Sequence, residues 1–170
     1  MNPEVEPVDG SRLCLACGLC CQGLLHDWAR LRDGEVEAAE RLGLSTEVQK
    51  GETAFSLPCP NHQDGCCTIY QERLSPCREY RCKLLRGYLD GRVTWEEGLR
   101  RVEQAKRLIA AIRVRLGAPK AAASVWQQLR DAETGPAASD PDLCLEVAAL
   151  LAHCQRHFWT RAEPKRTFRP

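Results

Sequence analysis

Four cysteines stand within eight residues near the start of the chain, in the segment CLACGLCC at residues 14–21. Two-residue spacing lets the thiols of Cys14, Cys17 and Cys20 converge on one point, on a tight loop that Gly18 helps to close because glycine accepts unusual backbone angles. The first three ligands of a bacterial ferredoxin run have the same spacing. A zinc site made only of cysteines accepts it equally well. The segment therefore predicts a metal site and leaves iron–sulfur and zinc open.

Cys21 follows Cys20 directly and needs its own interpretation. Neighbouring side chains of an extended chain point to opposite sides. We therefore expect Cys21 to face away from the first site, toward Cys67 and the segment CREYRC at residues 77–82. There it either joins another site or packs against the first.

A second run of cysteines follows in CPNHQDGCCTIYQERLSPCREYRC, with Cys59, Cys66, Cys67, Cys77 and Cys82. The first segment has no local fourth ligand, so Cys59, which precedes Pro60, is a candidate remote ligand. Arg73, Arg78 and Arg81 lie close in sequence, and cations beside several thiolates lower thiol pKa values. We assign Arg81 to a solvated face instead.

Together and in this order, CLACGLCC and CTIYQERLSPCREYRC resemble the YkgJ-like cysteine-cluster family, the CxxCxxCC zinc- or iron-chelating domain, over roughly residues 13–84. The chain departs from the family at Leu74, where many members have proline, and at Cys66, an additional thiol that leaves the choice between Cys66 and Cys67 open. Tyr70, Arg73, Pro76 and Arg78 match its accompanying motif. The resemblance implies that the metal ligands are Cys14, Cys17, Cys20, Cys21, Cys59, Cys67, Cys77 and Cys82.

The family is mostly bacterial and is related to the flagellin lysine methylases, for which an iron–sulfur cluster is assumed. This relation favours an iron–sulfur cluster, of the [4Fe–4S] type, over zinc in this chain. It does not transfer the methylase activity.

Length and composition suit a protein that folds around a core of its own. The chain has 170 residues, 44% hydrophobic and 28% charged, and a formal net charge of +1. A net charge so close to zero produces no long-range electrostatic field that would attract nucleic acid or a membrane surface. The N-terminus is acidic and lacks an apolar signal region, and the longest apolar run, residues 147–152, is too short to span a bilayer. We expect a cytoplasmic protein, whose eleven cysteines are metal ligands or free thiols, not a disulfide framework.

The residue patterns predict an α+β protein: a small metal-organised cysteine-rich domain with short strands and a short helix, followed by about three packed helices. Expected elements are a helix at 33–43 capped by Asp33, a hairpin of strands at 54–57 and 67–70, and helices at 94–116, 121–133 and from 141. The helix at 94–116 begins with a capping box of Thr94 and Glu97 and has one apolar stripe, and the helix from 141 has an apolar stripe at residues 143, 147, 150, 154 and 158. The expected division is a leader at 1–12, a metal-binding domain at 13–92, a helical region at 93–160 and a basic tail at 161–170.

Other residues that could do chemistry receive simpler interpretations. Cys144 and Cys154 lie on the last expected helix, where free cysteine behaves as a small core residue. His62 could complete a Cys/His zinc site, but we read it as a turn residue; His153 and His157 are read as a helix-surface pair. The basic residues of the helix at 94–116, namely Arg100, Arg101, Lys106, Arg107, Arg113 and Arg115, are read as a solvated face.

The sequence thus favours an iron–sulfur protein with a redox, sensing or enzyme-accessory role and a protein partner. A structural zinc module for interactions and a cluster-dependent methylase-like enzyme are the alternatives. No nucleotide-binding, P-loop or serine-hydrolase motif is present. Catalytic residues, substrate and oligomeric state do not follow from the sequence.

Overall fold

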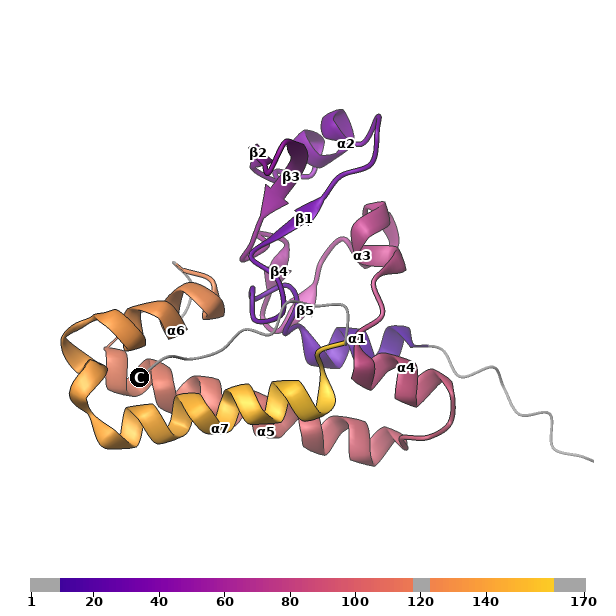
Figure 1. The fold of residues 1–170 in the computed structure, drawn as a ribbon. Helices are drawn as coiled ribbons and strands as arrows, with labels where there is room; N and C mark the ends of the chain where they lie inside the picture. The colour runs from indigo at the N-terminus through magenta and orange to yellow at the C-terminus, as the bar shows by residue number, and fades with distance from the viewer. Residues whose placement is uncertain (1–9, 118–122, 161–170) are drawn as a thin grey trace, which may run out of the picture.

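The computed structural model describes residues 10–117 and 123–160. It confirms the α+β class: short strands and short helices come first, and three packed helices follow (Figure 1). The first part contains α1 (Ser11–Cys17), β1 (Trp28–Arg30), α2 (Val36–Arg41), β2 (Thr46–Gln49), β3 (Glu52–Ser56), β4 (His62–Gln63), β5 (Cys66–Cys67), the 3-10 turn η1 (Tyr70–Glu72), α3 (Ser75–Glu79) and α4 (Lys83–Leu89). The second contains α5 (Trp95–Leu116), α6 (Val125–Thr134), the 3-10 turn η2 (Pro136–Ser139) and α7 (Pro141–His157).

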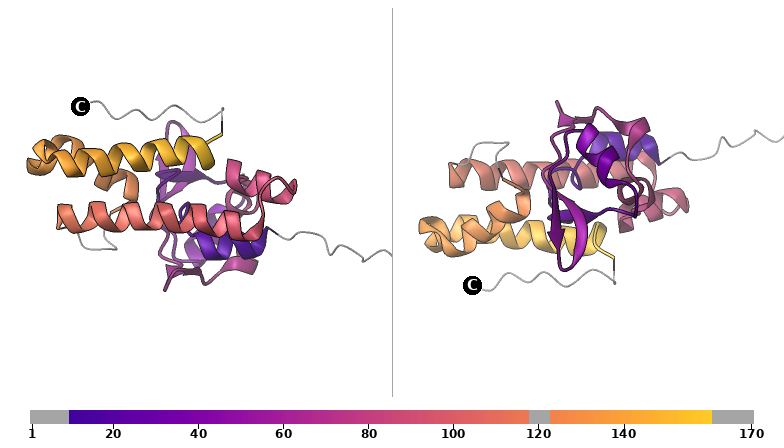
Figure 2. Two further views of the ribbon diagram at one scale, coloured as in Figure 1. Left: turned by 90° about the horizontal axis from the view of Figure 1, so that it is seen from below. Right: turned by 90° about the horizontal axis from the view of Figure 1, so that it is seen from above.

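Helices α5 and α7 lie side by side along most of their length (Figures 1 and 2). The capping motif expected at the start of α5 is present, because Thr94 Oγ1 accepts the backbone N–H of Glu97 at 3.2 Å. The apolar stripe expected on α7, residues 143, 147, 150, 154 and 158, is at most 1% exposed. The apolar residues therefore recur with the 3.6-residue period of an α-helix, and the side of the helix that carries them is buried. Helix α6 begins later than expected, at Val125, after its cap Ser124.

The main core joins both halves of the chain. Leu13, Leu19, Leu24 and Leu84 from the first part are buried with the apolar faces of α5, α6 and α7. A smaller core, with Phe55 at its centre, fills the space between the sheet, α2 and the segment before α3. The division at residues 92 and 93 stays a prediction, but the two regions share the larger core.

The sheet is antiparallel with strand order β1–β3–β2, and β4 pairs with β5 in a separate two-stranded hairpin. Both two-residue turns, Lys50–Gly51 and Asp64–Gly65, have positive φ at both positions, as type I′ hairpin turns require. The expected pairing of 54–57 with 67–70 is wrong. Residues 54–56 pair instead with β1 and β2, and after Cys67 the chain turns into η1.

Some local expectations also need correction. Helix α2 is capped by Glu35, not Asp33, with no side-chain hydrogen bond at the cap. Residues 11 and 12 of the expected leader belong to α1, while residues 1–9 and the basic tail at 161–170 lie outside the described residues. None of the described helices is long and apolar enough to cross a membrane.

Candidate metal centre

Helix α1 positions the first two cysteines. Cys14 and Cys17 lie one turn apart on it, and Gly18 ends it in the left-handed conformation, at φ 64°. A Cβ atom at Gly18 would stand 2.2 Å from Nε2 of His62. Glycine is therefore needed both for the backbone angle and for the close approach of the imidazole. The expected tight loop is in fact a short helix, and only the chain after it is a loop.

That loop carries Cys20 and Cys21 and is fixed from two sides. Within it, the backbone N–H of Gly23 donates to the carbonyl of Cys20 at 2.9 Å. From outside, the N–H of Val125 in the first turn of α6 donates to the carbonyl of Gln22 at 2.9 Å. The C-terminal helices therefore help to hold the cysteine loop in place.

Cys82 approaches the same region from the start of α4. It is the N-cap of this helix, and its Sγ accepts the backbone N–H of Leu85 at 3.4 Å. The N–H of Lys83 donates to the carbonyl of Phe158 at 2.9 Å, which ties this helix start to the end of α7. The position of Cys82 thus depends on contacts with distant parts of the chain.

The remaining cysteines come from three further segments. Cys59 follows β3, and its backbone N–H donates to the carbonyl of Cys21 at 2.8 Å. Cys67 lies in β5, opposite His62 in the hairpin register. Cys77 lies on α3. Backbone pairing therefore brings residues some forty positions apart in sequence against the loop.

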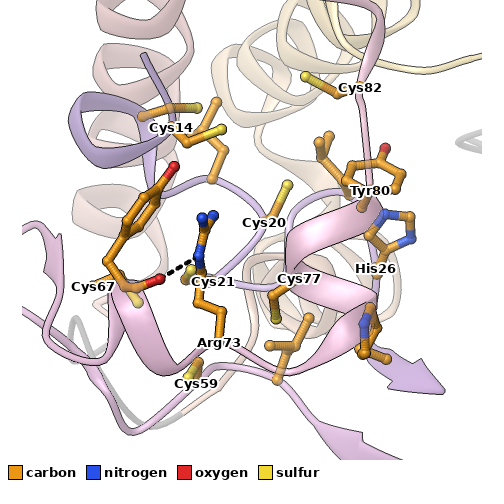
Figure 3. Close-up of a pocket in the computed structure, with 18 of the residues that line it drawn as sticks. Cys14, Cys20, Cys21, His26, Cys59, Cys67, Arg73, Cys77, Tyr80 and Cys82 are labelled. Carbon is orange, nitrogen blue, oxygen red and sulfur yellow. Dashed lines mark hydrogen bonds between the residues drawn. The ribbon is translucent and has the colours of Figure 1, made fainter. Parts of the chain in front are cut away.

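All eight cysteines that the resemblance implied as ligands line one cavity of about 140 Å³ (Figure 3). Leucine, phenylalanine and alanine side chains form much of its remaining wall. In the close-up, Cys14 and Cys82 lie toward the side of Cys20, whereas Cys59 and Cys67 lie toward the side of Cys21. The thiols therefore surround a space that is mostly apolar.

Cys14, Cys17, Cys20 and Cys82 are called the first group here, because each raises the thiol pKa of Cys17 or Cys20 or has its own raised by the others. Burial raises the pKa of the Cys17 thiol to about 12, and the charges of Cys82 and Cys14 add to this effect. Burial likewise raises the pKa of Cys20 well above its ordinary value, followed by the charges of Cys82 and Cys17. Cys82, and not Cys59, is thus the cysteine beside the triplet.

Cys21, Cys59, Cys67 and Cys77 are the second group. Burial raises the pKa of Cys21, and the charges of Cys59, Cys67 and Cys77 raise it further, in that order. Cys77 is exposed as a whole residue, but its thiol is turned to the cavity, where desolvation followed by the charges of Cys59 and Cys67 raises its pKa to about 11. The raised pKa values keep the thiols of Cys21 and Cys77 protonated at neutral pH unless a cation replaces their protons.

Two cations lie close to the thiols. Arg73 donates its Nε–H to the carbonyl of Tyr70 at 2.6 Å, and its guanidinium lies 3.3 Å from the centre of the Tyr70 ring. It lines the cavity and lowers the pKa of Cys77. Lys106 donates to the carbonyl of Ala16 at 2.7 Å and lowers the pKa of Cys17. The assignment of Lys106 to a solvated face is therefore wrong, because this side chain folds back onto the end of α1.

The sulfur atoms surround the cavity without crowding together. In residues 10–117 and 123–160, no three Cys, His, Asp or Glu side chains stand close enough to hold one metal ion. Around a tetrahedral zinc ion with Zn–S bonds of about 2.3 Å, the sulfur atoms are only about 3.8 Å apart.

The other candidate residues lie outside the cavity. Cys66 is exposed, whereas its neighbour Cys67 lines the wall. Cys154 is fully buried in the main core, and the Sγ of Cys144 donates to the carbonyl of Ala138 at 3.4 Å. His153 Nε2 lies 2.8 Å from the carbonyl of Arg101, and its ring packs edge-on against His157.

Two aromatic side chains at the cavity were not singled out from the sequence as site residues. His26 and Tyr80 both line it, and their rings meet edge to face with centres 4.4 Å apart. They come from segments more than fifty residues apart, so local sequence gave no signal for this contact. They form part of the wall between α1 and α3.

The comparisons with known proteins give one match. The chain matches the model of the CxxCxxCC family, described as a "putative zinc- or iron-chelating domain", over residues 13–104. No curated protein and no solved structure matches it. The matched region contains all eight cysteines of the cavity and ends within α5.

Proposed function

Because the chain belongs to the CxxCxxCC family, we propose that it is a cytoplasmic metal-binding protein that carries an iron–sulfur cluster on the first group, Cys14, Cys17, Cys20 and Cys82. Membership of this family supports metal binding in general and does not specify which metal is bound. The [4Fe–4S] type, the compartment and a redox or sensing role in support of a protein partner are our proposals.

One observation carries the preference for a cluster over a single ion. The thiols line a cavity of about 140 Å³, and no three donors among the described residues stand close enough to share one ion. Holding one water takes only about 10–15 Å³ of such space. A cavity of this volume with eight cysteines in its wall suits a polynuclear cluster, whose irons each take one cysteine.

The surroundings of the first group support this choice. The wall of the cavity is mostly apolar, and burial of Cys17 and Cys20 makes bare thiolates unfavourable there. Loading therefore has to remove thiol protons and supply positive charge in their place. Lys106 belongs to α5, and its side chain reaches the end of α1, where it contributes further positive charge beside Cys17. When bound, the cluster would supply one-electron chemistry, and these residues would tune its potential.

Anaerobic purification followed by analysis of iron, acid-labile sulfide and zinc per chain tests the proposal. We expect a brown protein with broad visible absorption and iron and sulfide in equal amounts. The Cys17→Ser variant should lose the sulfide and the colour, whereas the matched Cys144→Ser variant should keep both. A colourless protein with stoichiometric zinc, after expression with ample iron, would contradict the proposal.

A further inference from the structure

Basic side chains gather at the turn between α3 and α4. Residues 78–86, REYRCKLLR, contain a single acid, Glu79. The basic side chains of this segment are all exposed, and we call them the basic surface: Arg78, Arg81, Lys83 and Arg86. The end of α7 lies next to this surface, since the N–H of Lys83 donates to the carbonyl of Phe158 at 2.9 Å (Figure 1). Arg156, in the last turn of α7, is exposed as well and adds a further positive charge.

Hydrogen bonds to backbone carbonyls hold three of these arginines together. The Nη1–H groups of Arg81 donate to the carbonyl of Arg78 and, at 3.1 Å, to that of Tyr80. The Nε–H of Arg86 donates to the carbonyl of Arg81 at 2.9 Å. Because these contacts already restrict the side chains, a partner that binds them removes less conformational freedom. The basic surface is therefore arranged before any partner arrives.

The charge of the basic surface is not neutralised within the part of the chain that the structure describes. Glu79 is held by Arg32, which follows β1, and Asp90 at the end of α4 is held by Arg92. In residues 10–117 and 123–160, none of the four side chains of the basic surface forms an ion pair. Its positive charge is therefore available to a ligand.

The basic surface lies directly outside one wall of the cysteine cavity. Tyr80 and Cys82 stand on either side of Arg81 in the chain, and both line the same side of the cavity (Figure 3). Cys77, which precedes Arg78, also lines the cavity. A protein bound to the basic surface would therefore sit close to whatever the cavity holds.

We propose that the basic surface is the docking site for the acidic face of a one-electron carrier protein. The inference rests on the proposed function, because a carrier exchanges electrons with this chain only through a cluster. A reduced carrier seated here gives one electron to the oxidised cluster, and no bond is made or broken. Complementary charge steers such encounters, and salt screens it. The family description assigns neither a partner nor a docking site.

A compact acidic protein fits this surface better than a nucleic acid does. Exposed carboxylates bound it on the side of α3, where Asp33 follows Arg32 in the chain. Glu37 and Glu40 on α2 are exposed as well, and the whole chain has a formal net charge of only +1. An extended polyanion would run into these carboxylates, whereas the face of a small protein can avoid them.

Binding of flavodoxin, an acidic one-electron carrier, to the anaerobically purified chain tests the proposal. We expect binding to weaken about tenfold as ionic strength rises from about 0.01 M to about 0.15 M, since the screening length falls from about 30 Å to about 8 Å. At low salt, the triple variant Arg81→Gln, Lys83→Gln, Arg86→Gln should bind about tenfold more weakly than wild type. The matched control removes three exposed charges elsewhere and should bind like wild type: Arg41→Gln, Lys50→Gln, Arg107→Gln.

Equal affinities of the two triple variants would overturn the proposal, as would the absence of binding by wild type. The salt dependence is measured on wild type, so it tests the proposal even if a variant does not fold, and binding that does not respond to salt would contradict it. Tighter binding of duplex DNA or of phosphatidylserine vesicles than of flavodoxin, at the same salt, would assign the surface to another class of partner and also overturn the proposal.

Metal analysis of the same samples separates this inference from the proposed function. Salt-dependent binding at the basic surface by a chain without iron and sulfide would support the docking site and reject the cluster. A brown chain with iron and sulfide that fails the binding test would support the cluster and reject the docking site.

Discussion

The thiols of Cys20 and Cys21 are adjacent in the chain but belong to different electrostatic environments. Apart from burial, the charges that act most strongly on Cys20 are those of Cys82 and Cys17, whereas those that act most strongly on Cys21 are those of Cys59 and Cys67; each thiol also feels the other group, Cys20 through Cys21 and Cys21 through Cys17. One peptide unit therefore lies at the boundary between two groups of four cysteines.

Replacing Arg73 should weaken metal binding in the cavity without removing a ligand. In Arg73→Gln, a chelator should release the metal bound in the cavity about tenfold faster, equivalent to about 1.4 kcal/mol of activation free energy, because a cation beside the thiolates is lost. Arg73→Lys should restore part of the effect. The control is Arg81→Gln, since Arg81 is exposed and its guanidinium donates to the backbone carbonyls of Arg78 and Tyr80. Equal release rates in all three variants and wild type would count against a role for Arg73.

Cys154→Ser should lower stability and leave the metal content unchanged. Cys154 is fully buried, and a hydroxyl there costs about 1–3 kcal/mol unless it finds a partner. Urea denaturation gives the free energy of unfolding, and metal analysis gives the content. Cys144→Ser, at a half-buried position, should cost less. Loss of metal from Cys154→Ser would show that this residue is a ligand and not part of the core.

Gly18→Ala should destabilise the protein more than Gly43→Ala. Both glycines have similar positive φ, 64° and 70°, so both substitutions share a backbone cost of about 1–2 kcal/mol. Only Gly18 has a neighbour in the way, His62 Nε2 at 2.2 Å, whereas Gly43 faces open space. Thermal unfolding of both variants, with metal analysis, measures the difference. Equal costs would mean that the imidazole moves aside freely.

Removal of metal should loosen the sheet region before the long helices. Hydrogen exchange after chelation should show faster exchange in β1–β3, the β4–β5 hairpin and α3, while α5 and α7 keep their protection through the main core. Helix α1 should respond less than the sheet because Leu13 packs closely on Gly98 of α5. Equal loss of protection over the whole chain would contradict this order.

His157 should make stability fall under mildly acidic conditions. Burial, followed by the charges of His153 and Arg101, lowers the pKa of His157 from 6.5 to about 4. Between these values the unfolded chain binds the proton more readily, so stability falls as pH drops from about 6.5 toward 4. The free energy of unfolding should therefore decrease less between pH 7 and pH 5 in His157→Asn than in wild type. A steeper decrease in the variant would contradict the sign.

Features set by local sequence could be predicted well. The apolar stripe and cap of α5 and the buried face of α7 appear as expected. Each depends on residues within a few positions of one another, through helical periodicity, capping or backbone angles. The spacing of cysteines also singled out the residues that line the cavity, since ligand patterns are local as well.

What the sequence by itself determined is which residues are available for chemistry and where the long helices run. Only the tertiary structure decided that Cys82 joins the triplet, that Cys59 lies against Cys21, that Cys67 and not Cys66 faces the cavity, and that Lys106 folds back onto α1. These relationships depend on strands of two to five residues and on contacts between distant segments. Such strands are too short to show a period, so their partners are chosen by packing and backbone pairing across the whole fold.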